Sequence, residues 1–145
     1  MKRLSKKLRT LVLLIIGFVT MYESVSQTTE GDVKSVAEKF VKSADKQDPD
    51  LLQSVLYEDA KQFVMFGPQV MQSTASEYIG QIRDKKLGGK ERTIEIQNVL
   101  LEGENVAYVK LQAVGGGLTF SYQLTLFKLE DAWKIMTITT KASRS

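Results

Sequence analysis

Helical spacing of apolar residues dominates the first part of the chain. Apolar residues recur every three or four positions between Val33 and Ala44, and the lysines of this stretch lie off the apolar stripe. This pattern predicts an amphipathic helix with Asp32 at its N-cap. Asp48 followed by Pro49 then predicts the start of a second helix, because an aspartate cap and a proline in the first turn favour helix initiation. The two helices would form a helical hairpin.

A strand and a third helix are predicted in the middle of the chain. Residues 61–66 form a short apolar and aromatic run that ends at a Gly-Pro pair, which favours a strand and a turn. The apolar pair Val70-Met71 would supply a partner strand. Thr74 and Glu77 have the spacing of a capping box, which predicts a helix that runs until Gly88-Gly89.

From Glu91 onward the apolar period changes to two, which predicts an antiparallel meander. Hairpin turns are expected at 102–105, 115–117 and 130–131, where glycine, asparagine and acidic residues gather. In residues 118–126 one face is wholly apolar and the other is polar, so one face of the sheet packs on the helices. The sequence therefore predicts an α+β fold in which N-terminal helices pack on a curved antiparallel sheet.

The polar face of this predicted sheet is uncharged and rich in residues that favour strands. No lysine among these residues would oppose pairing with a second copy of the chain, so we expect a homodimer through this face. The alternative is a face that is simply solvated. The residues concerned are Thr119, Ser121, Gln123 and Thr125, with Thr137 and Thr139 nearby.

The N-terminus has the pattern of a secretory signal peptide. Five basic residues precede an apolar run of nine residues, 11–19, and small residues follow it. We expect residues 1–26 to be the signal peptide, 27–31 a short polar lead-in and 32–145 the domain. A membrane anchor is the alternative, but nine residues of helix span only about 14 Å of a hydrocarbon core of ~30 Å. The mature protein would be periplasmic or extracellular in a bacterium.

Charge and composition exclude several classes of function. Loss of residues 1–26 changes the formal net charge from +3 to −1 and leaves no basic block, so we expect no nucleic-acid partner and no membrane contact after cleavage. The sequence contains neither cysteine nor histidine. Zinc fingers, iron–sulfur clusters, cysteine nucleophiles and Ser-His-Asp catalysis are thereby excluded. We expect no metal site and no cofactor.

The order of elements is similar to the nuclear transport factor 2-like (cystatin-like) cone, which ketosteroid isomerases and polyketide cyclases also use. Short phrases across the domain resemble the putative lumazine-binding branch of that superfamily: Asp48-Pro-Asp-Leu-Leu, Leu56-Tyr-Glu-Asp-Ala60, Phe66-Gly67, Glu77-Tyr78-Ile79, Glu91-Arg-Thr-Ile-Glu-Ile96 and Ala132-Trp-Lys-Ile135. The resemblance implies a helical wall over a concave sheet, a tapered and mostly apolar pocket, and often a homodimer. It carries no ligand, because none of these phrases is a ligand-contact motif.

Candidate pocket residues are aromatic, soft or acidic side chains near the expected mouth of this cone. Tyrosine hydroxyls and rings, with adaptable apolar walls, suit a small apolar or aromatic ligand. Core packing is the alternative for each apolar residue. The candidate ligand-binding residues are Tyr57, Asp59, Phe63, Met65, Tyr78 and Tyr122.

Asp59 is the one candidate for a catalytic base, because it is expected where the second helix ends and a strand begins. A buried carboxylate there would have a raised pKa and could take a proton. Its alternative role is that of a turn or cap residue. We therefore favour an exported, non-catalytic module for small-ligand binding or interaction. The other hypothesis is a cofactor-free enzyme like ketosteroid isomerase or polyketide cyclase, with Asp59 as base and a tyrosine hydroxyl as electrophile.

Overall fold

The computed structural model describes residues 29–145, and those from Asp32 onward form one compact unit. The expected signal peptide and its cleavage site lie outside the described residues. The expected lead-in lies partly outside them, and its described part, residues 29–31, is helical. Within residues 29–145, no helix is both long enough and apolar enough to cross a membrane.

The predicted helical hairpin is present, but Asp32 is not the N-cap of the first helix, because residues 29–31 before it are already helical. The N-terminal helix runs to residue 45, and α2 (Pro49–Val55) follows after a short turn. Asp48 caps α2 as expected, because its carboxylate accepts a hydrogen bond from the Leu51 amide at 3.0 Å. This bond satisfies one of the amides that a helix start leaves without a partner.

The third helix, α3 (Ala75–Arg83), begins with the predicted capping box. The Thr74 hydroxyl accepts from the Glu77 amide at 3.2 Å, and the Glu77 carboxylate accepts from the Thr74 amide at 2.8 Å. The helix ends at Arg83, earlier than the predicted stop at Gly88-Gly89. The glycines instead lie in the loop of residues 84–92, which leads to the sheet.

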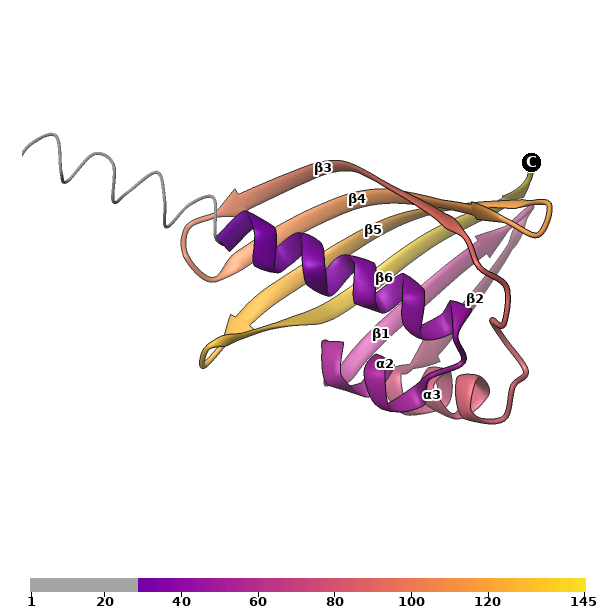
Figure 1. Cartoon of the computed structure of the whole chain (residues 1–145), viewed down its shortest axis with the longest axis horizontal. Coiled ribbons are helices and arrows are strands. Elements are labelled where there is room, and N and C mark those ends of the chain that lie inside the picture. Colours follow the sequence, from indigo (N-terminus) through magenta and orange to yellow (C-terminus); the bar gives the residue numbers. More distant parts are fainter. Residues whose placement is uncertain (1–28) are drawn as a thin grey trace, which may run out of the picture. The chain divides into compact units, whose positions relative to one another are not determined.

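Six strands form one sheet in the order β2-β1-β6-β5-β4-β3 (Figure 1). The predicted meander from β3 to β6 is antiparallel throughout, and so is the β1–β2 hairpin. The sheet is nevertheless mixed, because β1 pairs with β6 in parallel. The strands are β1 (Leu56–Phe66), β2 (Gln69–Thr74), β3 (Thr93–Glu102), β4 (Val106–Gly115), β5 (Leu118–Leu129) and β6 (Ala132–Arg144).

Strand β1 begins five residues earlier than the apolar run at Lys61 predicts. Leu56, expected on the second helix, is the first residue of the strand, and Asp59 lies inside the strand instead of at a helix–strand junction. The ladder with β6 is irregular between Leu56 and Lys61. This irregularity breaks the period of two and hides the start of the strand in the sequence.

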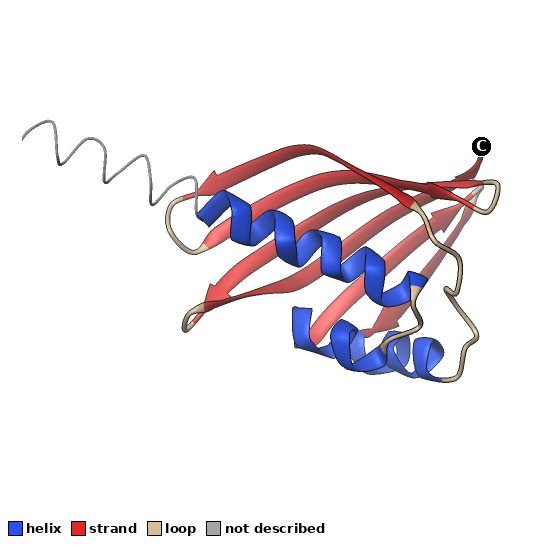
Figure 2. Ribbon diagram, in the orientation of Figure 1, coloured by secondary structure: helices blue, strands red, loops and turns tan. Residues whose placement is uncertain are grey.

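The helices cover one face of the sheet (Figure 2). The apolar stripe of the N-terminal helix, with Phe40 and Val41 fully buried, packs on inward side chains such as Leu111, Leu124 and Ile138. Each such side chain contributes about 1.5–3 kcal/mol by leaving water. The predicted α+β architecture, with helices on one face of the sheet, is confirmed.

The loop of residues 84–92 is fastened to the end of the N-terminal helix by its glycines. The Gly89 amide donates to the Ala44 carbonyl at 3.0 Å. Gly88 has φ +80°, and a Cβ added there would overlap the carbonyl of Ala44. This close approach of two backbones requires glycine.

Gly88→Ala should therefore destabilise the protein by at least about 2 kcal/mol, because it combines left-handed strain with a backbone overlap. Gly117→Ala is the matched control: its φ is +75°, but nothing lies within 4 Å of an added Cβ. We expect that control to cost about 1 kcal/mol. Urea unfolding followed by circular dichroism measures both, and equal losses would contradict the role given to the Ala44 contact.

Candidate functional site

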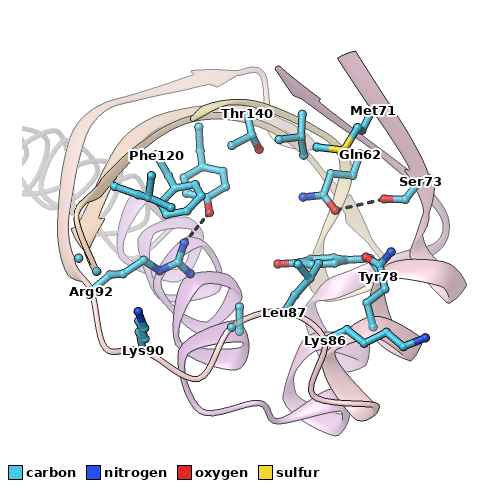
Figure 3. A pocket seen from close by; sticks show the side chains of 18 of the residues that line it. Gln62, Met71, Ser73, Tyr78, Lys86, Leu87, Lys90, Arg92, Phe120 and Thr140 are labelled. Carbon is cyan, nitrogen blue, oxygen red and sulfur yellow. Dashed lines mark hydrogen bonds between the residues drawn. The ribbon is translucent and has the colours of Figure 1, made fainter. Parts of the chain in front are cut away.

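A cavity of about 460 Å³ opens between the inner face of the sheet, α3 and the loop of residues 84–92 (Figure 3). Strands β1, β2, β5 and β6 supply its far wall, and α3 supplies one side. Much of the lining is apolar, including Val64, Met71, Leu87, Leu118 and Phe120. The volume lies within the range typical of small-molecule sites.

Arg92 is the central polar residue of the cavity wall. Its Nε donates to Oδ1 of Asp45 at 2.6 Å, and its backbone amide donates to Oδ2 of Asp45 at 3.0 Å. The two side chains are only 9% and 6% exposed. Asp45 closes the N-terminal helix and Arg92 precedes β3, so this buried ion pair joins the helix to the sheet.

The rest of the guanidinium is held by the cavity wall. One terminal nitrogen donates to the Tyr122 hydroxyl at 2.7 Å, and the other donates to the Val41 carbonyl at 3.2 Å. The guanidinium lies 4.9 Å from the centre of the Phe120 ring and 5.9 Å from that of Tyr122. Burial disfavours its charge, but Tyr122 and Asp45 outweigh burial and raise the pKa of Arg92. Arg92 is therefore a fixed cation.

Two tyrosines line the cavity in their neutral form. Burial raises the pKa of Tyr78, and the neighbouring Tyr122 raises it further. Burial also raises the pKa of Tyr122, against the opposing effect of Arg92. Tyr122 packs edge-on against Phe40, with ring centres 5.5 Å apart. Both phenols therefore stay protonated at neutral pH and can donate hydrogen bonds.

Strands β1 and β6 place two polar side chains on the far wall. Thr140 is 3% exposed, and its hydroxyl has no hydrogen-bond partner among the described residues. Gln62 is 8% exposed, and its carbonyl oxygen accepts from the Ser73 hydroxyl at 3.3 Å. The amide nitrogen of Gln62 remains directed at the cavity (Figure 3). A buried polar atom without a hydrogen-bond partner costs free energy, so packing alone does not explain why a hydroxyl is found at position 140.

The charged residues of the cavity wall are all basic. Lys86, Lys90 and Arg92 line the cavity, and among residues 29–145 no aspartate or glutamate does so. Lys90, which is exposed, lies beside Arg92 at one side of the cavity, whereas the ammonium of Lys86 points away from it (Figure 3). Within the described part of the chain no group of acidic residues could hold a metal ion.

The structure brings only two of the six candidate ligand-binding residues to this cavity, Tyr78 and Tyr122. Tyr57 is half-buried and packs against the core beyond the cavity lining. Asp59, the candidate base, is exposed on β1 and does not line the cavity. Its pairing with a cavity tyrosine, which the enzyme hypothesis needs, is absent from the described structure.

Phe63 and Met65 lie on the opposite face of the sheet. In β1 the residues that face the cavity are Gln62 and Val64, and the side chains between and after them point the other way. Phe63 is paired with Thr139, which belongs to the outer polar face. Phe63 and Met65 are expected in a pocket wall because of their residue type. The alternation of side chains along β1, however, decides which of them face the cavity.

Arg92, Gln62 and Thr140 are the cavity residues that sequence reasoning missed. Arg92 directly precedes a strand, and no local pattern marks it as a cavity residue, because its partner Asp45 is 47 positions away. A signal existed for Gln62, a polar residue on the same face as Val64 in an apolar strand. Thr140 lies on the same strand face as Ile138, which is buried, so it could have been recognised as a buried hydroxyl.

Loss of the Asp45 carboxylate should be strongly destabilising. Asp45→Asn leaves the Arg92 charge buried without its counterion, which costs about 3–5 kcal/mol in comparable buried pairs. The exposed pair between Glu38 and Lys42, at 3.8 Å, provides the control. Glu38→Gln should change stability by less than about 0.5 kcal/mol. Chemical denaturation of both variants checks this, and similar losses would contradict a special role for the buried pair.

Alkaline pH should destabilise the protein through Tyr78 and Tyr122. Their pKa values are raised above the ordinary 10.0, so their contribution is complete below pH 10 and is lost as pH rises toward the folded-state values. The free energy of unfolding should fall above pH 10, and less steeply in Tyr78→Phe. Urea titrations between pH 8 and pH 11.5, with absorbance at 295 nm, measure this. Ionisation of both phenols near pH 10 in the folded state would contradict it.

Comparisons with known proteins match most of the described chain. A family model described as "Putative lumazine-binding" matches residues 28–139. No curated protein matches the chain. Among solved structures, a nuclear transport factor 2-like protein of unknown function from Silicibacter pomeroyi superposes with a TM-score of 0.73 at 15% identity, covering 81% of this chain and 98% of that one.

Two further solved structures have the same fold. A ketosteroid isomerase-like protein from Erwinia carotovora has a TM-score of 0.64 at 14% identity, covering 80% of this chain and 97% of that one. A cystatin-like fold protein from Burkholderia xenovorans has a TM-score of 0.65 at 13% identity, with coverages of 81% and 94%. At these identities the likeness establishes the fold and not a shared reaction.

Proposed function

The chain belongs to the putative lumazine-binding family, and we propose that it is an exported, non-catalytic module that binds a small molecule in the cavity described above. The observation that carries this proposal is the cavity of about 460 Å³ itself, which is largely apolar and has no carboxylate in its described lining. An apolar body would be held by Phe120, Leu118 and Met71, and the few polar groups would orient it.

The position of the carboxylates argues against general-base chemistry at this cavity. A base must lie within hydrogen-bonding reach of the atom it deprotonates, but Asp59 is exposed and outside the lining. Asp45 is buried near the cavity, yet both of its oxygens accept hydrogen bonds from Arg92. Among residues 29–145, Tyr78 and Tyr122 therefore have no free carboxylate beside them of the kind that the isomerase-like alternative requires.

Export and self-association complete the proposal. The signal-peptide pattern of residues 1–26 supports export to the periplasm or the cell exterior. The outer face of the sheet, where Gln123 pairs with Thr139, supports a homodimer. The expectation that this face is uncharged is wrong, because Lys110 and Lys141 lie on it, in register with Gln123 and Ser121. In such a dimer their charges would have to remain solvated.

Native mass spectrometry of the protein from its own host's envelope tests all three statements. We expect a dimer, an N-terminus near residue 27, and a small-molecule adduct that is lost on denaturation. Val64→Trp should abolish the adduct, because Val64 lines the cavity. Met65→Trp is the matched control, since Met65 is the next residue, 44% exposed, on the other face.

Circular dichroism and thermal unfolding would first establish that both variants fold. Wild-type protein without an adduct, or equal loss in the two variants, would contradict binding in this cavity. A monomer would contradict the dimer alone, and an unprocessed N-terminus would contradict export with cleavage. Turnover of a carbonyl compound that disappears in Asp59→Asn would establish the catalytic alternative instead.

A further inference from the structure

The wall of the cavity offers cations without anions. Lys90 and Arg92 lie together at one side of the cavity (Figure 3), and no acidic residue among those described lines it. Asp45 neutralises part of the Arg92 charge. Its side chain is 6% exposed and lies outside the cavity lining. The Lys90 charge has no such counterion in the lining. A cationic ligand would be repelled here, and an anionic group would be attracted.

The hydrogen-bonding groups of the wall are mostly donors. Each terminal nitrogen of a guanidinium carries two hydrogens, and in Arg92 each is engaged once, so one N–H of each remains. The Tyr122 hydroxyl accepts from Arg92 and keeps its own hydrogen to donate. This end of the cavity can therefore donate several hydrogen bonds to one group of oxygen atoms, as carboxylate recognition requires.

A second donor site lies on the far wall. The Thr140 hydroxyl is buried, lines the cavity and has no partner among the described residues. The Gln62 carbonyl is occupied by Ser73, which leaves its amide nitrogen as a donor. An oxygen acceptor on the ligand would satisfy these groups and offset the cost of their burial.

We propose that the ligand is an organic carboxylate with an apolar, mostly flat body and an oxygen acceptor at its other end. Its carboxylate contacts Lys90 and the free N–H groups of Arg92, its body lies against Phe120, and its acceptor faces Thr140. The proposal rests on the proposed function, because it names the chemistry of the molecule that the cavity binds. A carboxylate placed elsewhere in the cavity would lose its hydration without a cation nearby, so the anionic end belongs beside Lys90 and Arg92.

Three probes on one naphthalene body separate this inference from simple apolar binding. They are 2-naphthoate, 2-naphthamide and 2-naphthylmethylammonium, and isothermal titration calorimetry measures each against the folded mature protein. We expect naphthoate to bind about tenfold more tightly than the amide, and the ammonium to bind most weakly. Added salt should weaken naphthoate binding and leave amide binding unchanged.

Matched lysine variants locate the charge effect. Lys90→Gln should weaken naphthoate binding about threefold to tenfold and leave naphthamide binding unchanged. Lys110→Gln removes the same charge from the outer face of the sheet and should change neither. Both lysines are exposed, so neither substitution should prevent folding.

The Thr140 contact has its own test. We expect 6-acetyl-2-naphthoate, whose acetyl oxygen is an acceptor, to bind more tightly than 2-naphthoate, and Thr140→Val to remove this gain while preserving thermal stability. A purely structural hydroxyl would leave the ratio of the two affinities unchanged. Absence of the gain, or its persistence in Thr140→Val, would overturn the assignment of Thr140.

The outcomes distinguish the two levels of the proposal. If no naphthalene probe binds and purified protein carries no adduct, the proposed function itself fails. If the amide or the ammonium binds as tightly as naphthoate, the cavity binds apolar bodies but the inference of an acid is wrong. Equal weakening by Lys90→Gln and Lys110→Gln would also overturn it, because the effect would then reflect the protein's net charge.

Discussion

The buried pair of Asp45 and Arg92 is the interaction on which the arrangement of the site depends. Asp45 is the last residue of the N-terminal helix, and Arg92 immediately precedes β3, so their bonds fix the end of the helix against one edge of the sheet. A buried charge pair is stabilising only when its remaining donors are satisfied. Val41 and Tyr122 each accept one further hydrogen bond from the guanidinium, and the Phe120 ring stacks on it. One contact thus ties the helix, the loop and β5 to a common point.

Several of the residues that line the cavity around that point are small or polar. Ala44, Gly88, Gly115 and Gly116 present a methyl group or backbone there, and Thr140 presents a hydroxyl. Gly88 also lets the loop of residues 84–92 approach the helix end directly. Close packing is the default for an interior. Around the cavity the lining instead leaves a space of about 460 Å³.

Sequence reasoning recovered the elements better than the site, and β1 explains the difference. Caps such as Asp48 and Thr74 act within four residues, and the alternation from β3 to β6 persists on both sides of two register shifts, so both can be recognised locally. The irregular pairing of β1 with β6 obscures the length of β1 in the sequence. Because Phe63 is aromatic, it is predicted to line the pocket, whereas Gln62 lines it in the structure. Arg92 acquires its role only through partners 30 to 51 positions away. Such long-range convergence leaves no period in the sequence.

The electrostatics of the cavity also explain why a shared fold need not carry a shared reaction. An enzyme that abstracts a proton with a carboxylate needs that carboxylate free and beside its substrate. Here the buried carboxylate of Asp45 forms an ion pair with Arg92, and this pair holds the helix to the sheet. The guanidinium faces the cavity in its place. This side of the cavity therefore presents hydrogen-bond donors and positive charge, which favour the anionic ligand proposed above. Fold comparison alone does not reveal this, because it depends on which partner of the pair faces the open space.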